Sequence, residues 1–194
     1  MSKTDRAPRR WSDATHASLI EAGIAAFGEH GFEALSEDAI ARRAGLTRGA
    51  IQYQFGGKRG LFAAVFRHIL AQTARALSDQ TMERAHSVAE LGDGVGVFMD
   101  LAMDPSRGRL LFVEAPVVLG WEDWRAGLRE AFAPLLHHAL GHWVSEGLLN
   151  EADVAGYAEV LLGAGVQAAL AQSAGDPAPR AALEAMIARL AARP

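Results

Sequence analysis

Apolar residues recur at intervals of three and four along almost the whole chain, and this spacing is the feature that most restricts the fold. It places the apolar side chains on one face of a helix, whereas a strand would alternate them with a period of two. Such alternation is scarce, and β-branched runs are as short as Val117-Val118. The pattern therefore predicts an all-α protein of about nine helices.

Glycines, prolines and capping residues divide the chain into the expected helices. By residue number these cover 13–29, 36–44, 47–55, 58–77, 82–103, 105–115, 121–146, 150–174 and 180–192. Ser36 is the expected N-cap of the second helix, with Glu37 and Asp38 in its first turn, where the helix dipole favours negative charge. Pro134 should kink the helix over 121–146 unless a boundary falls there.

The composition excludes several classes of protein. The chain has no cysteine, so disulfides, thiolate nucleophiles and Cys-ligated zinc or iron–sulfur clusters are ruled out. No apolar run follows the basic residues 1–10, and Glu159 and two glutamines interrupt the most apolar stretch, 154–174. This favours a buried helix over a membrane span. We expect a soluble, cytoplasmic protein with no membrane partner.

Charge is distributed unevenly along the chain. Residues 1–62 hold nine Lys and Arg against seven acids, whereas the remaining residues hold ten against sixteen. A polyanion would be repelled by the larger part and tolerated only by the N-terminal part. The positive excess is small, and a solvated surface accounts for it equally well.

Residues 40–51 have the pattern of a helix-turn-helix. Two short helices are separated by a turn at Gly45, where glycine permits the left-handed backbone, and Ala41 is small enough to let the helices cross closely. The apolar spacing predicts a shared core of Ile40, Leu46, Ile51 and Phe55. The outward face of the second helix then carries Arg48, Gly49, Gln52 and Tyr53. A helix of this length fits a major groove about 12 Å wide, although such turns also occur in helical bundles.

The DNA contacts that we expect follow from side-chain chemistry. Arg48 can donate two parallel hydrogen bonds to guanine, and Gln52 can pair with adenine in the same manner. Gly49 and Ala50 would let the backbone approach, with Ala50 against a thymine methyl group. Phosphate oxygens would be held by Ser36, Thr47, Tyr53, Gln54 and Lys58. An arm over the backbone or minor groove would come from Arg6, Arg9 and Arg10.

Residues 31–62 resemble the N-terminal DNA-binding domain of the tetracycline-repressor (TetR) family of bacterial transcription regulators. The matching residues are Gly31, Phe32, Ile40, Ala41, Ala44, Gly45, Thr47, Gly49, Ile51, Phe55, Lys58, Leu61 and Phe62. Two positions depart from the usual pattern: Gln52 stands where a Tyr is common, and Gln54 where a His is common. Both glutamines can still form hydrogen bonds.

The resemblance implies a ligand-responsive transcriptional repressor. In that reading residues 1–57 form a three-helix DNA-binding domain, and residues 58–194 form a helical domain for ligand binding and dimerisation. A homodimer would bind double-stranded DNA at a palindromic operator. A small molecule entering the C-terminal domain would move the two reading helices apart and release the DNA.

The last two helices are the expected dimer interface. Residues 154–174 are apolar around most of the helix, and Gly156, Gly163 and Gly165 allow close backbone approach. The last helix has one apolar stripe through Leu183, Met186, Ile187 and Leu190. With the symmetry mate these helices would form a four-helix interface. The alternative is that both helices only close the core of the monomer.

Aromatic residues of the larger domain suggest a ligand pocket. The candidate lining consists of Phe66, Phe98, Met99, Trp121, Trp124 and Phe132, together with Phe112 and Tyr157. Two tryptophans three residues apart, with acids between them, suit an aromatic or cationic compound. These residues would also make an ordinary core.

We expect no cofactor and no metal site. His138, His142 and Glu146 follow one another at steps of four, a spacing that metals accept, but a solvent-facing stripe is the simpler interpretation without a fourth ligand. The sequence has no paired carboxylates, Ser/His/Asp order or phosphate-cradling glycine loop, so we expect no enzyme. The remaining alternatives are an all-α enzyme and a helical protein-interaction module, neither of which binds DNA.

Overall fold

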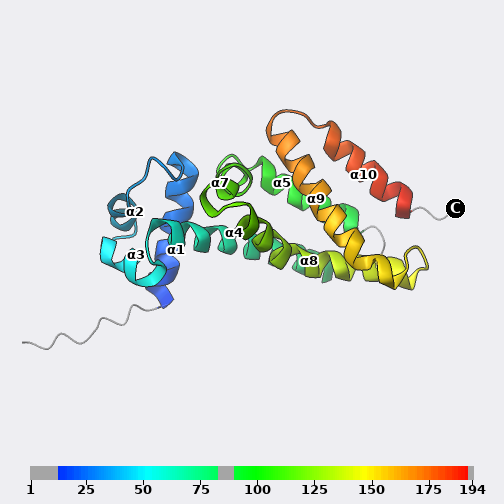
Figure 1. Cartoon of the computed structure of the whole chain (residues 1–194), viewed down its shortest axis with the longest axis horizontal. Coiled ribbons are helices and arrows are strands. Elements are labelled where there is room, and N and C mark those ends of the chain that lie inside the picture. Colours follow the sequence, from blue (N-terminus) through cyan, green and yellow to red (C-terminus); the bar gives the residue numbers. More distant parts are fainter. Residues whose placement is uncertain (1–12, 83–89, 192–194) are drawn as a thin grey trace, which may run out of the picture. The chain divides into compact units, whose positions relative to one another are not determined.

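The computed structural model of the protein describes residues 13–82 and 90–191, and all the elements found in these ranges are helices (Figure 1). In chain order they are α1 (Asp13–His30), α2 (Glu37–Arg43), α3 (Arg48–Phe55), α4 (Lys58–Met82), α5 (Glu90–Met103), α6 (Arg107–Arg109), the π-helical turn η1 (Leu110–Glu114), α7 (Ala115–Leu119), α8 (Trp121–Ser145), the 3-10 turn η2 (Glu151–Asp153), α9 (Val154–Ser173) and α10 (Ala178–Ala191). The all-α prediction is confirmed.

The observed helices follow the predicted ones closely. Because α6, η1 and α7 continue one another without a break, as do η2 and α9, the described residues form nine helical segments, as predicted. The helix α4 continues to Met82, five residues beyond its expected end, and residues 83–89 of the helix expected over 82–103 lie outside the described residues. The segment after α5 contains a π-helical turn that the sequence pattern did not indicate. The helix α8 continues through the exposed Pro134.

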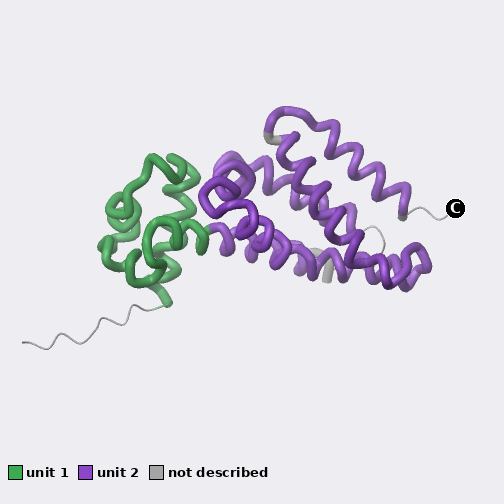
Figure 2. Tube along the Cα trace, viewed as in Figure 1, with its two compact units in different colours: residues 1–65 green, residues 66–194 purple. Residues whose placement is uncertain are grey.

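The chain divides into two compact units, residues 1–65 and 66–194 (Figure 2). The sequence placed the division at the start of α4, between residues 57 and 58. The structure places it inside α4, because the first two turns of this helix pack into the core of the N-terminal unit. There Leu61, Phe62 and Val65 are fully buried. The helix α4 therefore belongs to both units.

The core of the N-terminal unit is aromatic. Phe27 of α1 and Phe62 of α4 have ring centroids 5.1 Å apart, and Phe32 lies 5.9 Å from the first and 5.3 Å from the second. Ile40 of α2 and Ile51 of α3 are fully buried beside this core. These contacts fix α2 and α3, which are too short to be stable as isolated helices.

The C-terminal unit is built around α9, which packs against α5, α8 and α10. At the π-helical turn, the indole N–H of the buried Trp124 donates a hydrogen bond to the carbonyl of Leu111, at 2.8 Å. The ring of Phe66 packs against the backbone of Gly127, where a β-carbon would not fit. These contacts join α8 to η1 and to the part of α4 that belongs to the C-terminal unit.

Candidate nucleic-acid interface and ligand cavity

A tight turn joins α2 to α3. Gly45 has a φ of 66°, in the left-handed region that glycine adopts without strain. The backbone N–H of Leu46 then donates to the carbonyl of Ala41 at 2.8 Å, which closes the turn, and Thr47 occupies the N-cap position of α3. This is the geometry that the residue pattern predicted for the helix-turn-helix.

The helix α3 has a buried and an exposed face. Ala50 and Ile51 are completely buried, whereas Arg48, Gly49, Gln52 and Tyr53 are exposed. Ala50 was expected to touch a thymine methyl group, and the structure corrects this, because its side chain lies on the buried face of α3 and is inaccessible. The exposed face of α3 therefore consists of Arg48, Gly49, Gln52 and Tyr53.

A carboxylate from α2 reaches this polar face. Glu37 accepts a hydrogen bond from Nε of Arg48 at 2.9 Å, and its two oxygens lie 2.9 and 2.7 Å from Nε2 of Gln52. It also accepts the backbone N–H of Lys58, the first residue of α4, at 2.9 Å. We call these residues the Glu37 cluster. The sequence pattern indicated Glu37 only as a favourable charge in the first turn of α2.

The hydrogen bonds of the Glu37 cluster lower the pKa of Glu37. The bond from Gln52 has the largest effect, partial burial opposes it, and the bonds from Arg48 and the Lys58 backbone act in the same direction as the first. A lowered pKa in the folded state means that the cluster stabilises the fold above the ordinary pKa of glutamate. This stabilisation is lost as the pH falls through the lowered value.

The side chain of Lys58 serves the fold of the N-terminal unit. Its ammonium group donates to the carbonyls of Phe32 and Leu35, each at 2.9 Å, and lies 4.1 Å from the centroid of the Phe32 ring. A phosphate contact by Lys58 was expected, but here the ammonium is held by backbone oxygens. The structure therefore assigns it first to anchoring the loop between α1 and α2.

The other predicted phosphate contacts lie near the ends of α2 and α3. The hydroxyl of Ser36 accepts the backbone N–H of Ala39 at 3.2 Å, as an N-cap, and Thr47 is exposed and makes no such cap bond. Tyr53 is 68% exposed, and Gln54 lies 3.4 Å from the ring of His16 on α1. The expected arm of Arg6, Arg9 and Arg10 lies outside the described residues.

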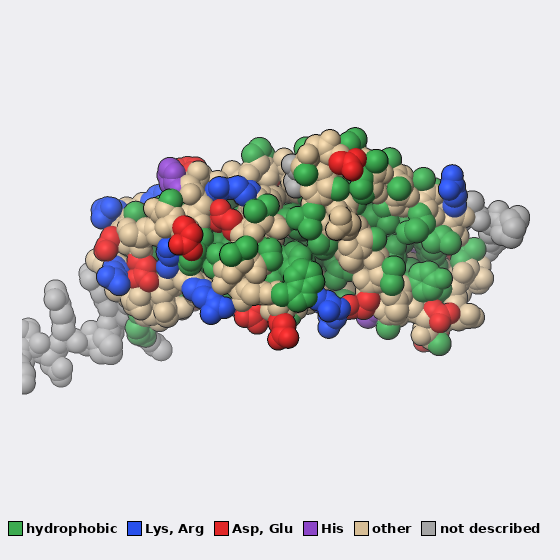
Figure 3. Space-filling model, turned by 45° about the horizontal axis from the view of Figure 1, so that its top comes forward, with side chains coloured by type: hydrophobic (Ala, Val, Ile, Leu, Met, Phe, Trp, Pro, Cys, Tyr) green, Lys and Arg blue, Asp and Glu red, His purple; other side chains and the backbone are tan. Residues whose placement is uncertain are grey.

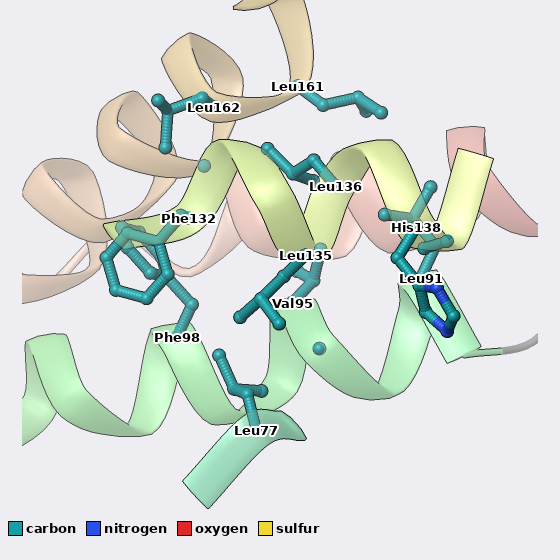
Figure 4. Close-up of a pocket in the computed structure, with 13 residues that line it drawn as sticks. Leu77, Leu91, Val95, Phe98, Phe132, Leu135, Leu136, His138, Leu161 and Leu162 are labelled. Carbon is teal, nitrogen blue, oxygen red and sulfur yellow. The ribbon is translucent and has the colours of Figure 1, made fainter. Parts of the chain in front are cut away.

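The C-terminal unit contains an apolar cavity of about 90 Å³ that is partly open (Figure 4). Residues from α4, α5, α8 and α9 line it: Leu77, Leu91, Gly94, Val95, Phe98, Phe132, Leu135, Leu136, His138, Ala139, Leu161, Leu162 and Gly165. Phe98 and Phe132 lie at one end, with ring centroids 5.2 Å apart, and His138 lies at the other beside Leu91. Among these lining residues only His138 has a polar side chain.

Of the six residues Phe66, Phe98, Met99, Trp121, Trp124 and Phe132, which were expected to line a ligand pocket, the cavity includes Phe98 and Phe132. The other four lie elsewhere because they pack into the core or face solvent. Phe66 and Met99 are buried, the indole of Trp124 is bonded to Leu111, and Trp121 is 63% exposed. The aliphatic lining was missed because it comes from four helices that are distant in the sequence.

Two of the three histidines of α8 form a pair. Nε2 of His138 and Nε2 of His142 lie 3.4 Å apart, and the two rings meet edge to face. Within residues 13–82 and 90–191, no three His, Cys, Asp or Glu side chains are grouped so that they could hold a metal ion.

The helices α9 and α10 expose apolar side chains. Val160 is 66% exposed, and Tyr157, Met186 and Leu190 are each exposed by 40% or more. In Figure 3 hydrophobic side chains gather on the face of the C-terminal unit that is turned to the viewer. Residues 151–172 are long and apolar enough to cross a membrane, with a mean hydropathy of 1.4, but a single helix of this kind is weak support for a membrane span.

Comparison with known proteins matches both units to one family. Residues 19–65 match the bacterial regulatory proteins of the tetR family, and residues 88–192 match the Tetracyclin repressor-like C-terminal domain. A crystal structure of a TetR-family transcriptional regulator from Pectobacterium atrosepticum superposes with a TM-score of 0.75 and 25% identity, over 95% of this chain and 94% of that one.

Curated relatives match shorter regions. The HTH-type transcriptional regulator BetI 2 of Chromohalobacter salexigens is 40% identical over 72 residues, which are 37% of this chain and 33% of the relative. The Transposon Tn10 TetC protein of Escherichia coli is 24% identical over 109 residues, 56% of this chain and 55% of the relative. The chain thus spans between a third and about half of the length of these two relatives. The family match over residues 88–192 alone covers more than half of the chain, which belongs to the tetracycline-repressor (TetR) family of bacterial transcription regulators.

Proposed function

We propose that this protein is a cytoplasmic, ligand-responsive repressor that binds a palindromic operator as a homodimer and is released by a small molecule. The observation that carries the proposal is the exposed polar face of α3, with Arg48, Gln52 and Tyr53, held on the fully buried Ala50 and Ile51. A helix presented in this way can enter a major groove and donate to base edges. Membership of the TetR family supports the same function.

In the proposed complex, α3 reads the bases and the residues around it hold the backbone. Arg48 contacts a guanine, and Gln52 contacts the neighbouring base pairs. Phosphate oxygens are held from the N-terminal ends of α2 and α3 and from the exposed face of α3, by Ser36, Thr47, Tyr53 and Gln54. Gly49, whose surroundings are open, lets the helix approach the groove.

Replacing Arg48 with alanine is expected to weaken binding to the operator about 5- to 150-fold, because one bidentate pair with a base is lost. Footprinting on the DNA that flanks the protein's own gene should show wild-type protection of an inverted repeat that weakens as salt is raised. The variant should lose its preference at one base of each half-site. The control is Arg75→Ala, which removes the same charge from an exposed position of α4. Unchanged affinity and base preference in Arg48→Ala would show that α3 does not read the operator.

The apolar cavity is the proposed effector site. Its lining is aliphatic and aromatic apart from His138, so it favours a small, uncharged, apolar molecule. An apolar cavity of about 150 Å³ holds benzene, and the cavity in this protein is smaller. An effector of the size of benzene or larger would therefore have to push the lining outward. Leu77 lies in this lining, and the same helix, α4, begins at Lys58 in the Glu37 cluster. Movement of α4 is therefore the proposed route from effector to DNA.

Replacing Gly94 with leucine is expected to fill the cavity and abolish release by the effector, while binding to the operator is retained. Gly94 lines the cavity, and a β-carbon there would meet no atom within 4 Å, so the leucine side chain has room to enter. The first measurement is the release of operator DNA by a panel of small apolar molecules. The second is NMR of the methyl groups that line the cavity, which reports whether xenon binds there. Gly92→Leu is the matched control on α5, since Gly92 is equally open but does not line the cavity. Equal responses of the two variants would place the effector elsewhere.

The exposed apolar side chains of α9 and α10 are the proposed dimer interface. A second copy would cover Val160, Tyr157, Met186 and Leu190, which otherwise meet water. A self-complementary interface with twofold symmetry matches the twofold symmetry of a palindromic operator.

A further inference from the structure

An acid at a surface that binds DNA requires an explanation, because phosphates repel it. Glu37 is such an acid. Only 14% of its side chain is exposed, against 61% for its partner Arg48, so the carboxylate lies beneath the donors rather than in front of them. Its position beneath the donors means that it acts on DNA through Arg48 and Gln52.

The bond to Arg48 leaves the reading atoms of the arginine free. Glu37 accepts from Nε, at 2.9 Å. Guanine is read through two parallel N–H groups, and the two terminal nitrogens of the guanidinium can supply them while Nε stays bound. The carboxylate therefore restricts the plane of the guanidinium without competing with the base.

The bonds to Gln52 occupy one of its donors. Only the amide nitrogen can donate to a carboxylate, and both oxygens of Glu37 lie within 2.9 Å of Nε2. The nitrogen carries two N–H groups that point in different directions, whereas the two carboxylate oxygens lie close together, so Glu37 takes one N–H. The other N–H and the amide oxygen remain, and adenine is read by such a pair. The carboxylate therefore restricts the plane of the amide without competing with the base.

We propose that Glu37 is a positioning residue that sets the DNA sequence preference of this protein. It orients Arg48 toward guanine, and it orients the amide of Gln52 toward adenine. The inference rests on the proposed function, since it requires that α3 reads DNA.

Two further contacts hold Glu37 in place. The backbone N–H of Lys58 donates to the same oxygen, Oε1, as Gln52. Gly57, with a φ of 123°, leaves room for the carboxylate, because a β-carbon there would lie 3.1 Å from Oε1. The start of α4 is thus joined to the reading face of α3 through one carboxylate.

The test compares the base preferences of Glu37→Gln with those of the wild type, by selection of bound duplexes from a random-sequence pool. The amide has nearly the same shape and keeps an acceptor for the Lys58 N–H, so the fold should be retained. We expect the preference for guanine at the Arg48 position to fall about tenfold, as expected for one lost charge-assisted hydrogen bond. At the Gln52 position we expect adenine to lose its advantage over other bases by a similar factor.

Asp38→Asn is the matched control, since it removes the same charge from the same turn of α2 at an exposed position. It should leave both base preferences unchanged. Gln52→Ala tests the second claim without altering Glu37, and it should abolish the adenine preference at one position only. In the double variant, Glu37→Gln with Gln52→Ala, the base preference at the Gln52 position should be the same as in Gln52→Ala alone.

The outcomes separate the two proposals. If the wild type selects an inverted repeat and Glu37→Gln selects the same bases with the same preferences, the role of Glu37 is overturned and the proposed function stands. A uniform loss of affinity over all sequences would also overturn it, because that result shows a merely structural role. If the wild type selects no sequence at all, the proposed function fails, and this inference fails with it.

Discussion

Replacing Gly60 with alanine is expected to destabilise the N-terminal unit by about 3 kcal/mol or more, at the upper end of what overpacking costs. Gly60 lies in the first turn of α4, directly against the end of α3. A β-carbon at this position would overlap the carbonyl oxygen of Phe55, and it would also lie 2.9 Å from the carbonyl carbon. The obstacle is backbone, so no side-chain rotation can relieve it.

The free energy of unfolding of this variant, measured with a chemical denaturant, should fall together with its affinity for the operator. Gly141→Ala is the control, because Gly141 lies in α8 and a β-carbon there meets nothing within 4 Å. That substitution should raise stability by about 0.5–1 kcal/mol, the usual gain from removing glycine from a helix. Wild-type stability in Gly60→Ala would mean that the corner between α3 and α4 is looser than the structure has it.

Features governed by local chemistry were predictable from the sequence. The turn between α2 and α3 is one example, because Gly45 is followed by Leu46 and Thr47, which are suited to a core position and an N-cap. The helix boundaries are another, since glycine, proline and capping residues act within a few residues of their own position. The exposed face of α3 followed from the spacing of Ile51 and Phe55.

Features that depend on packing between distant segments were not predictable. The ammonium of Lys58 reaches backbone carbonyls 23 and 26 residues away, which no spacing rule indicates. The cavity lining comes from four helices, and the aromatic residues singled out in the sequence are mostly used elsewhere. The π-helical turn at 110–114 has no sequence signal, although Trp124 satisfies one of its carbonyls.

The Glu37 cluster lies between these cases. Arg48 and Gln52 are four residues apart, so a helical reading places both on one side of α3. The first turn of α2 carries Glu37 and Asp38, so a search for complementary charge across the turn would have offered both acids as partners. The exact pairing of its oxygens, and the link to the Lys58 backbone, required the positions of α2, α3 and α4 together.

Replacing Val160 with aspartate is expected to convert the proposed dimer into monomers and to weaken binding to the operator by about 100-fold or more. Val160 is 66% exposed on α9, where the proposed partner would cover it. A carboxylate buried in an apolar interface without a partner loses its hydration, and that cost opposes association. A monomer engages one half-site at a time, so it loses the high effective concentration that a linked pair has at the second half-site. Sedimentation velocity and footprinting measure the two effects.

Val117→Asp is the matched control, since Val117 on α7 is 83% exposed and the exchange of side chains is the same. It should leave both the dimer and the footprint intact. If Val160→Asp remains dimeric, or if Val117→Asp dissociates instead, the interface does not lie on α9. Should the wild type be monomeric and bind lipid vesicles, the apolar surface of α9 would serve a membrane. In either case, twofold contact through the last two helices could not explain how two copies of α3 reach a palindromic site.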